Sequence, residues 1–182
     1  MEISVILTLG MLRIIMNELK NKLRNIRRWL RVNVNFLVAK RKIASYKSKP
    51  TINVKSEFNG KTHLGDNTHF NGMVVTGKGA VFIGDNFHCG RDCLIISDSH
   101  DYKNAEVLPY DNKLITPDTI IEDNVWLGSR VIILPGIKIG YGAIVQAGSV
   151  VVHDIEPLSI VGGHPAKAFM SRNAEHYFSL SS

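Results

Sequence analysis

Apolar side chains in this sequence recur every six residues, and this spacing constrains the fold more than any other feature. The longest series has seven members: Ile115, Ile121, Leu127, Ile133, Ile139, Val145 and Val151. Two shorter series share the spacing: Ile83, Cys89 and Ile95, and Ile52, Phe58, Leu64 and Phe70. Neither an α-helix, with about 3.6 residues per turn, nor a simple alternating strand explains a period of six.

A coil of three short strands joined by tight turns does explain the period. Each side of such a coil takes six residues, so a full coil takes about 18, and coils stack at the strand spacing of about 4.8 Å. The corner sequences Leu64-Gly65-Asp66-Asn67 and Ile83-Gly84-Asp85-Asn86 are 19 residues apart, and Ile121-Glu122-Asp123-Asn124 repeats them. Gly, Asp and Asn tolerate the backbone angles of tight corners. We therefore predict a mainly β chain that folds as a parallel β-helix.

The six-residue register also predicts the domain organisation. It stops after Ile95 and resumes at Ile115, so residues 51–170 are expected to form the β-helix with a projecting loop at 97–114. Pro50 marks the expected end of an N-terminal arm (1–50), and residues 171–182 form a C-terminal tail. Two cysteines in 182 residues exclude a disulfide scaffold and favour a reducing compartment, which predicts a cytoplasmic location.

Charge separates the arm from the rest of the chain. Residues 1–50 hold 12 Lys or Arg against Glu2 and Glu18, whereas the remaining 132 residues hold 10 Lys or Arg against 14 Asp or Glu. The net charges are +10 and −4. A mildly acidic body disfavours nucleic acid as a partner.

The arm carries a second periodicity. Apolar residues follow one another at alternating steps of four and three: Val5, Leu9, Leu12, Met16, Leu19, Leu23, Ile26 and Leu30. This spacing of about 3.5 residues predicts one apolar seam on a helix, and an interruption near Val32–Asn35 is compatible with the pattern. The apolar stretch from Ile3 to Met16 is shorter than the ~20 residues of a membrane-spanning helix. Glu2 precedes it and the basic residues follow it, so a cleavable secretion signal is not expected.

Two interpretations of the arm remain open at this point. The seam packs against the body or a neighbouring subunit, or residues 1–45 form an interfacial helix with apolar side chains at the lipid boundary and cations among anionic headgroups. The second interpretation places the protein at the inner face of the cytoplasmic membrane.

Several stretches resemble the hexapeptide-repeat acyltransferases, whose fold is a left-handed parallel β-helix: Ile83-Gly84-Asp85-Asn86, Ser97-Asp98-Ser99-His100, Asn124-Val125-Trp126-Leu127-Gly128-Ser129, Pro135-Gly136, Ala147-Gly148-Ser149 and Gly162-Gly163-His164-Pro165-Ala166-Lys167. The likeness covers about residues 51–170 and extends to the galactoside, maltose and serine O-acetyltransferases and to acetyltransferases of surface-polysaccharide synthesis. It implies an acyltransferase that forms a homotrimer and binds acetyl-coenzyme A in the groove between adjacent helices.

His100 is the candidate general base. It stands at the base of the projecting loop, where the coil still fixes its position, and the resemblance implies the catalytic histidine at this place. Neutral imidazole can take the proton of a hydroxyl that attacks a thioester near pH 7. A carboxylate from Asp98 or Asp101, or a backbone carbonyl, would accept the other ring N–H and fix the tautomer.

The resemblance also implies contacts for the coenzyme and the oxyanion. The backbone N–H of Ser129 would stabilise the oxyanion, and Trp126 would pack along the substrate or pantetheine. Ala147 matches a position that bonds the pantetheine amides. Lys167 matches a basic residue near the coenzyme phosphates; Met170 stands where many relatives have a further basic residue, with Arg172 nearby.

Three residues are candidates for the acceptor site: Asn71, His88 and Tyr110. Asn71 precedes Gly72, so a simple turn is the competing interpretation. His69, His88 and Trp126 occupy corresponding positions on successive coils. Cys89 and Cys93 fall at inward positions, which predicts buried structural thiols, and no metal site is expected because three converging histidines are not evident.

These residues predict an acetyl-coenzyme A-dependent O-acetyltransferase for a sugar hydroxyl of a surface polysaccharide or its precursor. Three alternatives stay open: O-acetylation of serine or a small sugar, N-acetylation of a nucleotide-linked amino sugar, and a non-catalytic trimeric scaffold. The acyl group, taken as acetyl, and the acceptor are not fixed by the residues.

Overall fold

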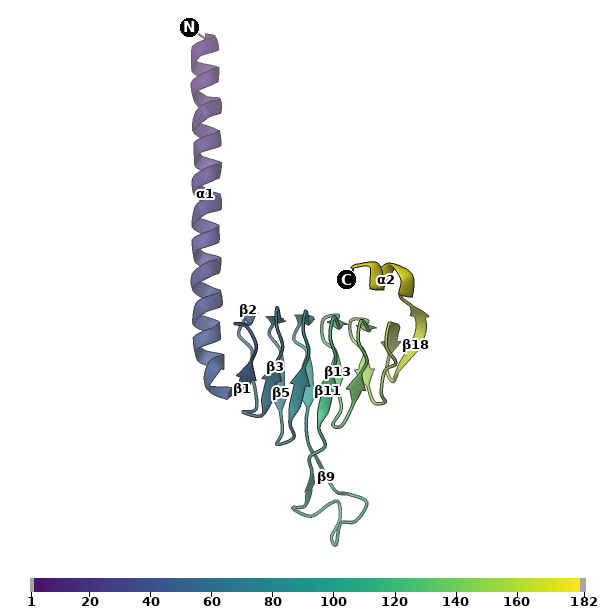
Figure 1. The fold of residues 1–182 in the computed structure, drawn as a ribbon. Helices are drawn as coiled ribbons and strands as arrows, with labels where there is room; N and C mark the ends of the chain where they lie inside the picture. The colour runs from purple at the N-terminus through teal and green to yellow at the C-terminus, as the bar shows by residue number, and fades with distance from the viewer. Residues whose placement is uncertain (1, 181–182) are drawn as a thin grey trace.

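The protein is a parallel β-solenoid with one long N-terminal helix (Figure 1). The computed structural model describes the backbone of residues 2–180 and their side chains except those of 2–12, 14 and 15. The seam residues Val5, Leu9 and Leu12 lie outside the described side chains, and Ser181 and Ser182 of the C-terminal tail lie outside the described residues.

The described strands build three parallel faces of the solenoid. The first face has the order β1 (Ile43–Tyr46), β3 (Thr62–Leu64), β6 (Val81–Ile83), β11 (Thr119–Ile121), β14 (Lys138–Ile139). The second has β2 (Thr51–Val54), β4 (His69–Asn71), β7 (His88–Arg91), β12 (Trp126–Leu127), β15 (Ile144–Val145), β17 (Ser159–Gly163) and the antiparallel β18 (Ala166–Ser171). The third has β5 (Val74–Thr76), β8 (Leu94–Ile96), β13 (Ile132–Ile133), β16 (Val150–Val151).

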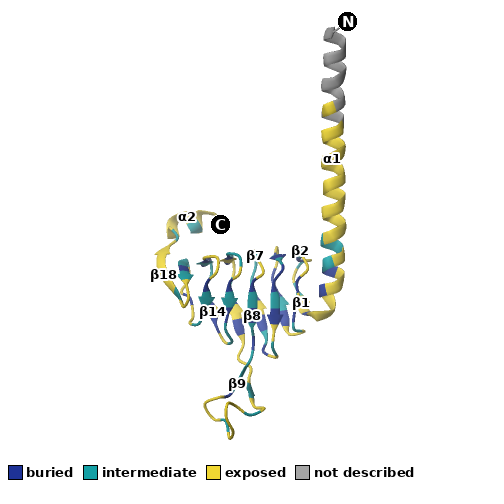
Figure 2. Ribbon diagram, turned by 180° about the vertical axis from the view of Figure 1, so that it is seen from behind, coloured by how far each residue is buried: buried dark blue, intermediate teal, exposed yellow. Residues whose placement is uncertain are grey.

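The six-residue series forms the core, with one exception. Its members from Ile52 to Val151, apart from Ile115, are at most 5% exposed, and Figure 2 shows the burial inside the coils. Ile115 was expected to point inward, but it is 45% exposed. It belongs to β10 (Leu114–Ile115), which pairs antiparallel with β9 (Ser99–His100) at the base of the projecting loop. The inward series therefore resumes at Ile121.

Stacked polar corners hold successive coils in register. Asn67, Asn86 and Asn124 all adopt left-handed backbone angles, with φ of 49°, 55° and 59°. The amide Nδ2 of Asn67 donates to Oδ1 of Asn86 (2.9 Å), and Nδ2 of Asn86 donates to Oδ1 of Asn124 (3.0 Å). Beside them Oδ1 of Asp85 accepts the backbone N–H of Asp66 (2.8 Å). These corners are the places where the sequence repeats Gly, Asp and Asn.

Helix α1 (Glu2–Ala39) crosses the N-terminal end of the solenoid and continues past it (Figure 1). It runs through Val32–Asn35 without the interruption that the sequence allowed. Phe36 and Ala39 are buried, and the Phe36 ring packs edge-on against Tyr46 at 5.7 Å. Within the described residues, no helix combines the length and the apolar character needed to cross a membrane.

The first coil begins earlier than Pro50. After the short 3-10 helix η1 (Lys40–Lys42), β1 starts at Ile43 and pairs in parallel with β3. Ile43 is 9% exposed, so it extends the core by one strand. Tyr46 of β1 lies six residues before Ile52 and pairs with the inward Leu64. The six-residue register therefore extends to this strand, before the boundary expected at Pro50.

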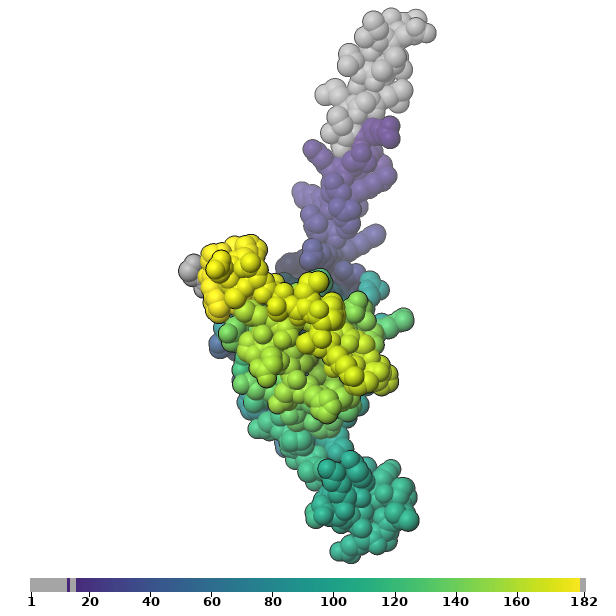
Figure 3. Space-filling view, turned by 90° about the vertical axis from the view of Figure 1, so that its right-hand side faces the viewer, coloured from purple at the N-terminus to yellow at the C-terminus, as the bar shows by residue number. Residues whose placement is uncertain are grey.

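The chain ends by folding back over the solenoid. Strand β18 reverses direction against β17, and helix α2 (Ala174–Leu180) follows it across the edge of the second face (Figures 1 and 3). In Figure 3 the last residues form a ridge over the coils, and the loop at 97–114 projects from the opposite side.

Candidate active site

His100 stands at the neck of the projecting loop. It is the last residue of β9 and pairs with Leu114 of β10, so the hairpin fixes its backbone. Its ring lies on the ring of Tyr110, with centroids 3.8 Å apart and planes 20° apart. Tyr110 therefore contacts the candidate base directly.

A backbone carbonyl orients the His100 ring. Nδ1 lies 2.9 Å from the carbonyl oxygen of Asp111. A carbonyl can only accept a hydrogen bond, so this contact places the proton on Nδ1 and leaves Nε2 with the lone pair of the neutral ring. The arrangement suits a general base acting through Nε2.

Neither carboxylate that the sequence singled out is hydrogen-bonded to the His100 ring in the described structure. Oδ2 of Asp98 accepts the backbone N–H of Lys78 (2.9 Å). Asp101 accepts hydrogen bonds from the side chain of Asn104 (3.0 Å), which together with Lys113 lowers the pKa of its carboxyl. Both aspartates instead stabilise the base of the loop.

Asp111 is the residue that sequence reasoning missed. Its carboxylate accepts the backbone N–H groups of Lys113 (2.8 Å) and Glu106 (3.2 Å), and these bonds lower its pKa. The side chain thus holds the turn whose carbonyl holds His100. Because a carbonyl is common to every residue, no residue-type signal could have identified this contact.

A column of rings runs along the second face, as the repeat predicts. His69 pairs with His88, and His88 pairs with Trp126, in adjacent parallel strands. The His69 and His88 rings stack at 5.7 Å. Partial burial lowers the pKa of His69, and the nearby His88 and Arg28 lower it further.

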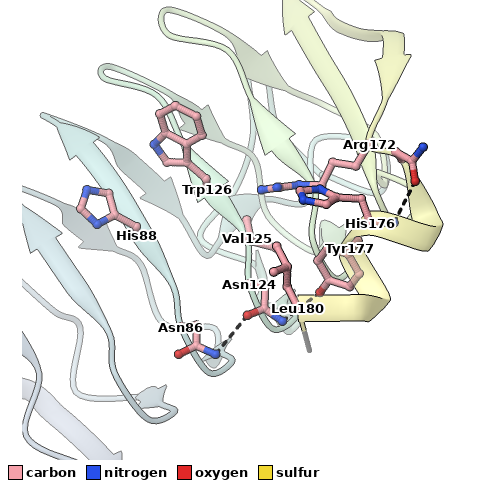
Figure 4. Close-up of a pocket in the computed structure, with 10 residues that line it drawn as sticks. Asn86, His88, Asn124, Val125, Trp126, Arg172, His176, Tyr177 and Leu180 are labelled. Atoms are coloured by element: carbon pink, nitrogen blue, oxygen red, sulfur yellow. Dashed lines mark hydrogen bonds between the residues drawn. The ribbon is translucent and has the colours of Figure 1, made fainter. Parts of the chain in front are cut away.

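A cleft of about 830 Å³ opens between this column and the C-terminal segment (Figure 4). Its lining includes three sequence-predicted residues, His88, Trp126 and Arg172. The His88 and Trp126 side chains are exposed. The Arg172 Nε donates to the carbonyl of Gly142 (2.6 Å), which fixes the guanidinium at the edge of the cleft.

Helix α2 supplies the other wall of the cleft. The hydroxyl of Tyr177 accepts a hydrogen bond from Nδ2 of Asn124 (2.8 Å) and so ties α2 to the last asparagine corner. His176 also lines the cleft. Sequence reasoning found no signal for Tyr177 or His176, because both lie in the tail beyond the repeat.

Ser129 and Ala147 lie at one corner of adjacent coils, two residues past the ends of β12 and β15. Oγ of Ser129 accepts the backbone N–H of Arg91 (3.0 Å), and the Ser129 carbonyl accepts the N–H of Gly148 (2.9 Å). A Cβ at Gly128 would lie 2.4 Å from the Ala147 nitrogen. The coils thus approach each other too closely there for any side chain except hydrogen.

Two predicted residues, Lys167 and Asn71, remain to be located. Lys167 is exposed on β18, opposite Gly162 of β17. Asn71 is half-buried, and its Nδ2 donates to the Cys89 carbonyl (2.7 Å). This hydrogen bond links two coils, so Asn71 has a structural role whatever else it contacts.

The two cysteines are buried inside the coil. Cys89 and Cys93 are free and at most 1% exposed. The contact with Cys93 and burial raise the pKa of the Cys89 thiol well above its usual range, which makes it unreactive. Among the described residues, no group of three or more His, Cys, Asp or Glu side chains converges as a metal site requires.

Comparison with known proteins agrees with the repeat. Residues 118–152 match the family model described as the hexapeptide repeat of succinyl-transferase. A hexapeptide-repeat-containing acetyltransferase from Vibrio cholerae, solved in complex with acetyl-coenzyme A, has a TM-score of 0.62 at 28% identity, and the match covers 76% of each chain. Residues 118–152 are therefore a hexapeptide repeat. The similarity of the chain to these acetyltransferases confirms the left-handed β-helix that the sequence predicted.

Further proteins that are similar to this chain are also named acetyltransferases. The galactoside O-acetyltransferase of Escherichia coli is 30% identical over 129 residues, which cover 66% of this chain and 60% of the relative. A maltose O-acetyltransferase from Clostridium difficile has a TM-score of 0.57 at 26% identity, with 71% and 66% coverage. A chloramphenicol acetyltransferase of Escherichia coli is 48% identical over 63 residues. This match covers 35% of the present chain and only 30% of the chloramphenicol acetyltransferase.

Proposed function

We propose that this protein is an acetyl-coenzyme A-dependent O-acetyltransferase that acts on a sugar hydroxyl of a surface polysaccharide or its precursor. The observation that carries the proposal is the orientation of His100, whose Nδ1 is held by the Asp111 carbonyl. A fixed imidazole with Nε2 available at the neck of a loop is suited to take a proton from a hydroxyl. The names of the relatives support acetyl transfer.

The reaction would proceed by direct attack on the thioester. Nε2 of His100 accepts the proton of the acceptor hydroxyl while its oxygen forms a bond to the thioester carbonyl carbon. The negative charge that develops on the carbonyl oxygen is stabilised by the backbone N–H of Ser129. The carbon–sulfur bond then breaks, and the coenzyme sulfur leaves with the proton that His100 received.

We assign the remaining candidates by the resemblance and, for Trp126 and Arg172, also by their place in the lining of the cleft. Trp126 would pack along the pantetheine, Ala147 would bond its amides, and Lys167 and Arg172 would face the coenzyme phosphates. His88 and Tyr110 would contact the acceptor; His88 lines the cleft and the Tyr110 ring lies on the His100 ring, which supports this assignment. Asn71 is the weakest acceptor candidate because its amide already bonds the coil.

A homotrimer is part of the proposal. His100 is absent from the residues that line the cleft of the described chain, so a neighbouring copy would have to bring its loop to a shared groove. We expect light scattering to give a mass of about three times 20.3 kDa. A fully active monomer would contradict the shared groove.

The decisive experiment measures release of coenzyme A thiol from acetyl-coenzyme A with a panel of acceptors. We expect release with sugars that carry a free hydroxyl and none with the matched deoxy sugars. If serine, chloramphenicol or an amino sugar gives faster thiol release than the sugars, the acceptor belongs to that class and not to the proposed sugar hydroxyls. A trimer that releases no thiol with any acceptor would indicate a scaffold.

A further inference from the structure

Helix α1 carries an exposed apolar stripe that the fold does not use. Seven side chains make up what we call the outer stripe, each 47–65% exposed: Met16, Leu19, Leu23, Ile26, Leu30, Val34 and Leu37. Successive members are three or four residues apart, so they share one face of the helix. We propose that the outer stripe binds the surface of an anionic lipid bilayer, with α1 lying in the plane of the membrane.

The outer stripe faces away from the solenoid. Phe36 and Ala39 are the buried side of α1, and Nδ2 of the neighbouring Asn35 donates to the Ile52 carbonyl of the first coil (3.1 Å). At about 100° per residue, Leu30 and Val34 lie roughly opposite that buried side. Figure 1 shows that α1 crosses the end of the solenoid. A flat surface can therefore contact the stripe along its length, and the coils would stack away from that surface.

The charges beside the outer stripe fit anionic headgroups. Residues 13–42 contain ten Lys or Arg and a single acid, Glu18. Among the described residues none of these ten forms an ion pair, since every ion pair involves Lys47, Lys55, Lys113 or Lys138. The basic side chains of Lys20, Arg24, Arg27, Arg28 and Arg31 gather around one hollow of the helix. An apolar stripe flanked by cations is the pattern of an interfacial helix.

The same charges disfavour a second copy of this chain as the occupant. In a parallel pair of α1 helices with Leu23 and Ile26 in the seam, Lys22 of one copy would face Arg27 of the other. Like charges at these flanking positions destabilise a coiled coil. Asn33 also takes the next seam position after Leu30, which ends the heptad pattern. The bilayer is thus the better match for both the stripe and its flanks.

The first test measures flotation of the full-length protein with lipid vesicles in the absence of acetyl-coenzyme A. We expect at least tenfold stronger partitioning into equimolar phosphatidylglycerol and phosphatidylcholine than into phosphatidylcholine alone. We expect the stripe variant, which carries Leu19→Gln, Leu23→Gln, Ile26→Gln and Leu30→Gln, to partition into the anionic vesicles at least tenfold more weakly than the wild type. The control Asn17→Gln, Asn21→Gln, Asn25→Gln changes the polar face of the same helix and should partition like the wild type.

The second test separates local from overall charge. The variant Arg24→Gln, Arg27→Gln, Arg31→Gln should bind anionic vesicles at least tenfold more weakly. The control Lys61→Gln, Lys78→Gln, Lys103→Gln removes the same charge from exposed positions of the body and should change binding less than twofold. Equal losses in the two variants would overturn the proposal.

Two further results would also overturn it. One is a full-length protein that ignores anionic vesicles at low salt. The other is a stripe variant that keeps its vesicle binding, or that instead changes the oligomeric mass measured by light scattering, which would assign the stripe to a neighbouring copy. Circular dichroism of every variant verifies that helix and solenoid remain folded. None of these measurements depends on acetyl transfer, so failure here leaves the proposed reaction untouched.

Discussion

The solenoid and the free part of α1 are both built on a regular column of aliphatic side chains, but they use it in opposite ways. Ile133 in the solenoid is 0% exposed, whereas Ile26 in the helix is 47% exposed. The solenoid also bonds its polar corners to each other, as the Asn67–Asn86–Asn124 ladder shows. Among the described side chains, the cations of the helix have no acidic partner. The solenoid therefore buries its aliphatic column within the chain, whereas the helix leaves its column exposed, as the proposed membrane contact requires.

The largest effect is expected on the rate of the reaction, from a substitution in the solenoid part of the molecule. His100→Asn removes the basic nitrogen of the proposed general base and should lower the rate of thiol release by about 10²–10⁴-fold. Folding should be unchanged, because the hairpin that carries His100 lies outside the buried column. Steady-state kinetics with the acceptor identified by the panel gives the rate.

His153→Asn is the matched control for that variant. His153 is exposed on the solenoid and has no proposed role, so its loss should leave the rate unchanged. Near wild-type transfer by a folded His100→Asn protein would refute the proposed base, and His88 would be the next residue to replace.

The second effect is on the free energy of unfolding, and it compares the same substitution, Ile to Ala, in the solenoid and in helix α1. Ile133→Ala leaves a cavity in the buried column and should lower the free energy of unfolding by about 2–5 kcal/mol. Ile26→Ala changes an exposed side chain and should alter it by no more than about 0.5 kcal/mol. Chemical denaturation followed by circular dichroism measures both values. Equal losses would mean that the outer stripe is buried in solution.

Much of this fold was predictable because its signal is periodic. The inward column of the solenoid was read from the spacing of six, and the pairing of His88 with Trp126 followed from the same register. Ile115 was placed wrongly because the period cannot show that a hairpin has interrupted the coil. Strand β1 was missed because the arm was expected to end at Pro50, although Tyr46 stands six residues before Ile52 and pairs with Leu64.

The site was less predictable than the fold. His100 was identifiable from its motif and its place at the start of a loop. The group that orients it was not, because the Asp111 carbonyl reaches Nδ1 through the loop's three-dimensional path. Tyr177 and His176 line the cleft because β18 turns the tail back over the solenoid, and no local pattern specifies where that tail lies.

The third effect concerns the polar corners of the solenoid. Asn86→Ala removes two side-chain hydrogen bonds and places alanine at a φ of 55°, so it should cost about 1–3 kcal/mol of stability. Asn86→Gly also loses the hydrogen bonds but tolerates the backbone angle. The glycine variant should therefore be the more stable of the two in thermal denaturation. The reverse order would show that the corner is not strained.

The smallest effect is the pH dependence of stability that comes from Glu122, at the first face of the solenoid. Glu122 bonds Lys138 (2.8 Å) and the backbone N–H of Tyr141 (2.9 Å), and these contacts lower its pKa below the ordinary value of 4.5. Because the pKa of Glu122 is lowered in the folded state, its stabilisation is complete above pH 4.5, and it is lost as the pH falls through the pKa of the folded state. Glu122→Gln should thus flatten the decline of Tm in acid.

The helix offers a matched control for this variant. Glu18 forms no ion pair among the described residues, so Glu18→Gln should leave the slope of Tm against pH unchanged. The same slope in both variants and the wild type would mean that the Glu122 contacts do not contribute to stability.

The way the two ends of the solenoid are closed limits how copies can join. A stack of parallel coils ends in unpaired strand edges that could accept another copy and grow into a fibre. Here α1 lies against β2 at one end, and at the other β18 reverses direction against β17. On the second face, growth through further parallel coils is therefore obstructed at both ends. This favours side-by-side association of copies, which can close into rings of fixed size.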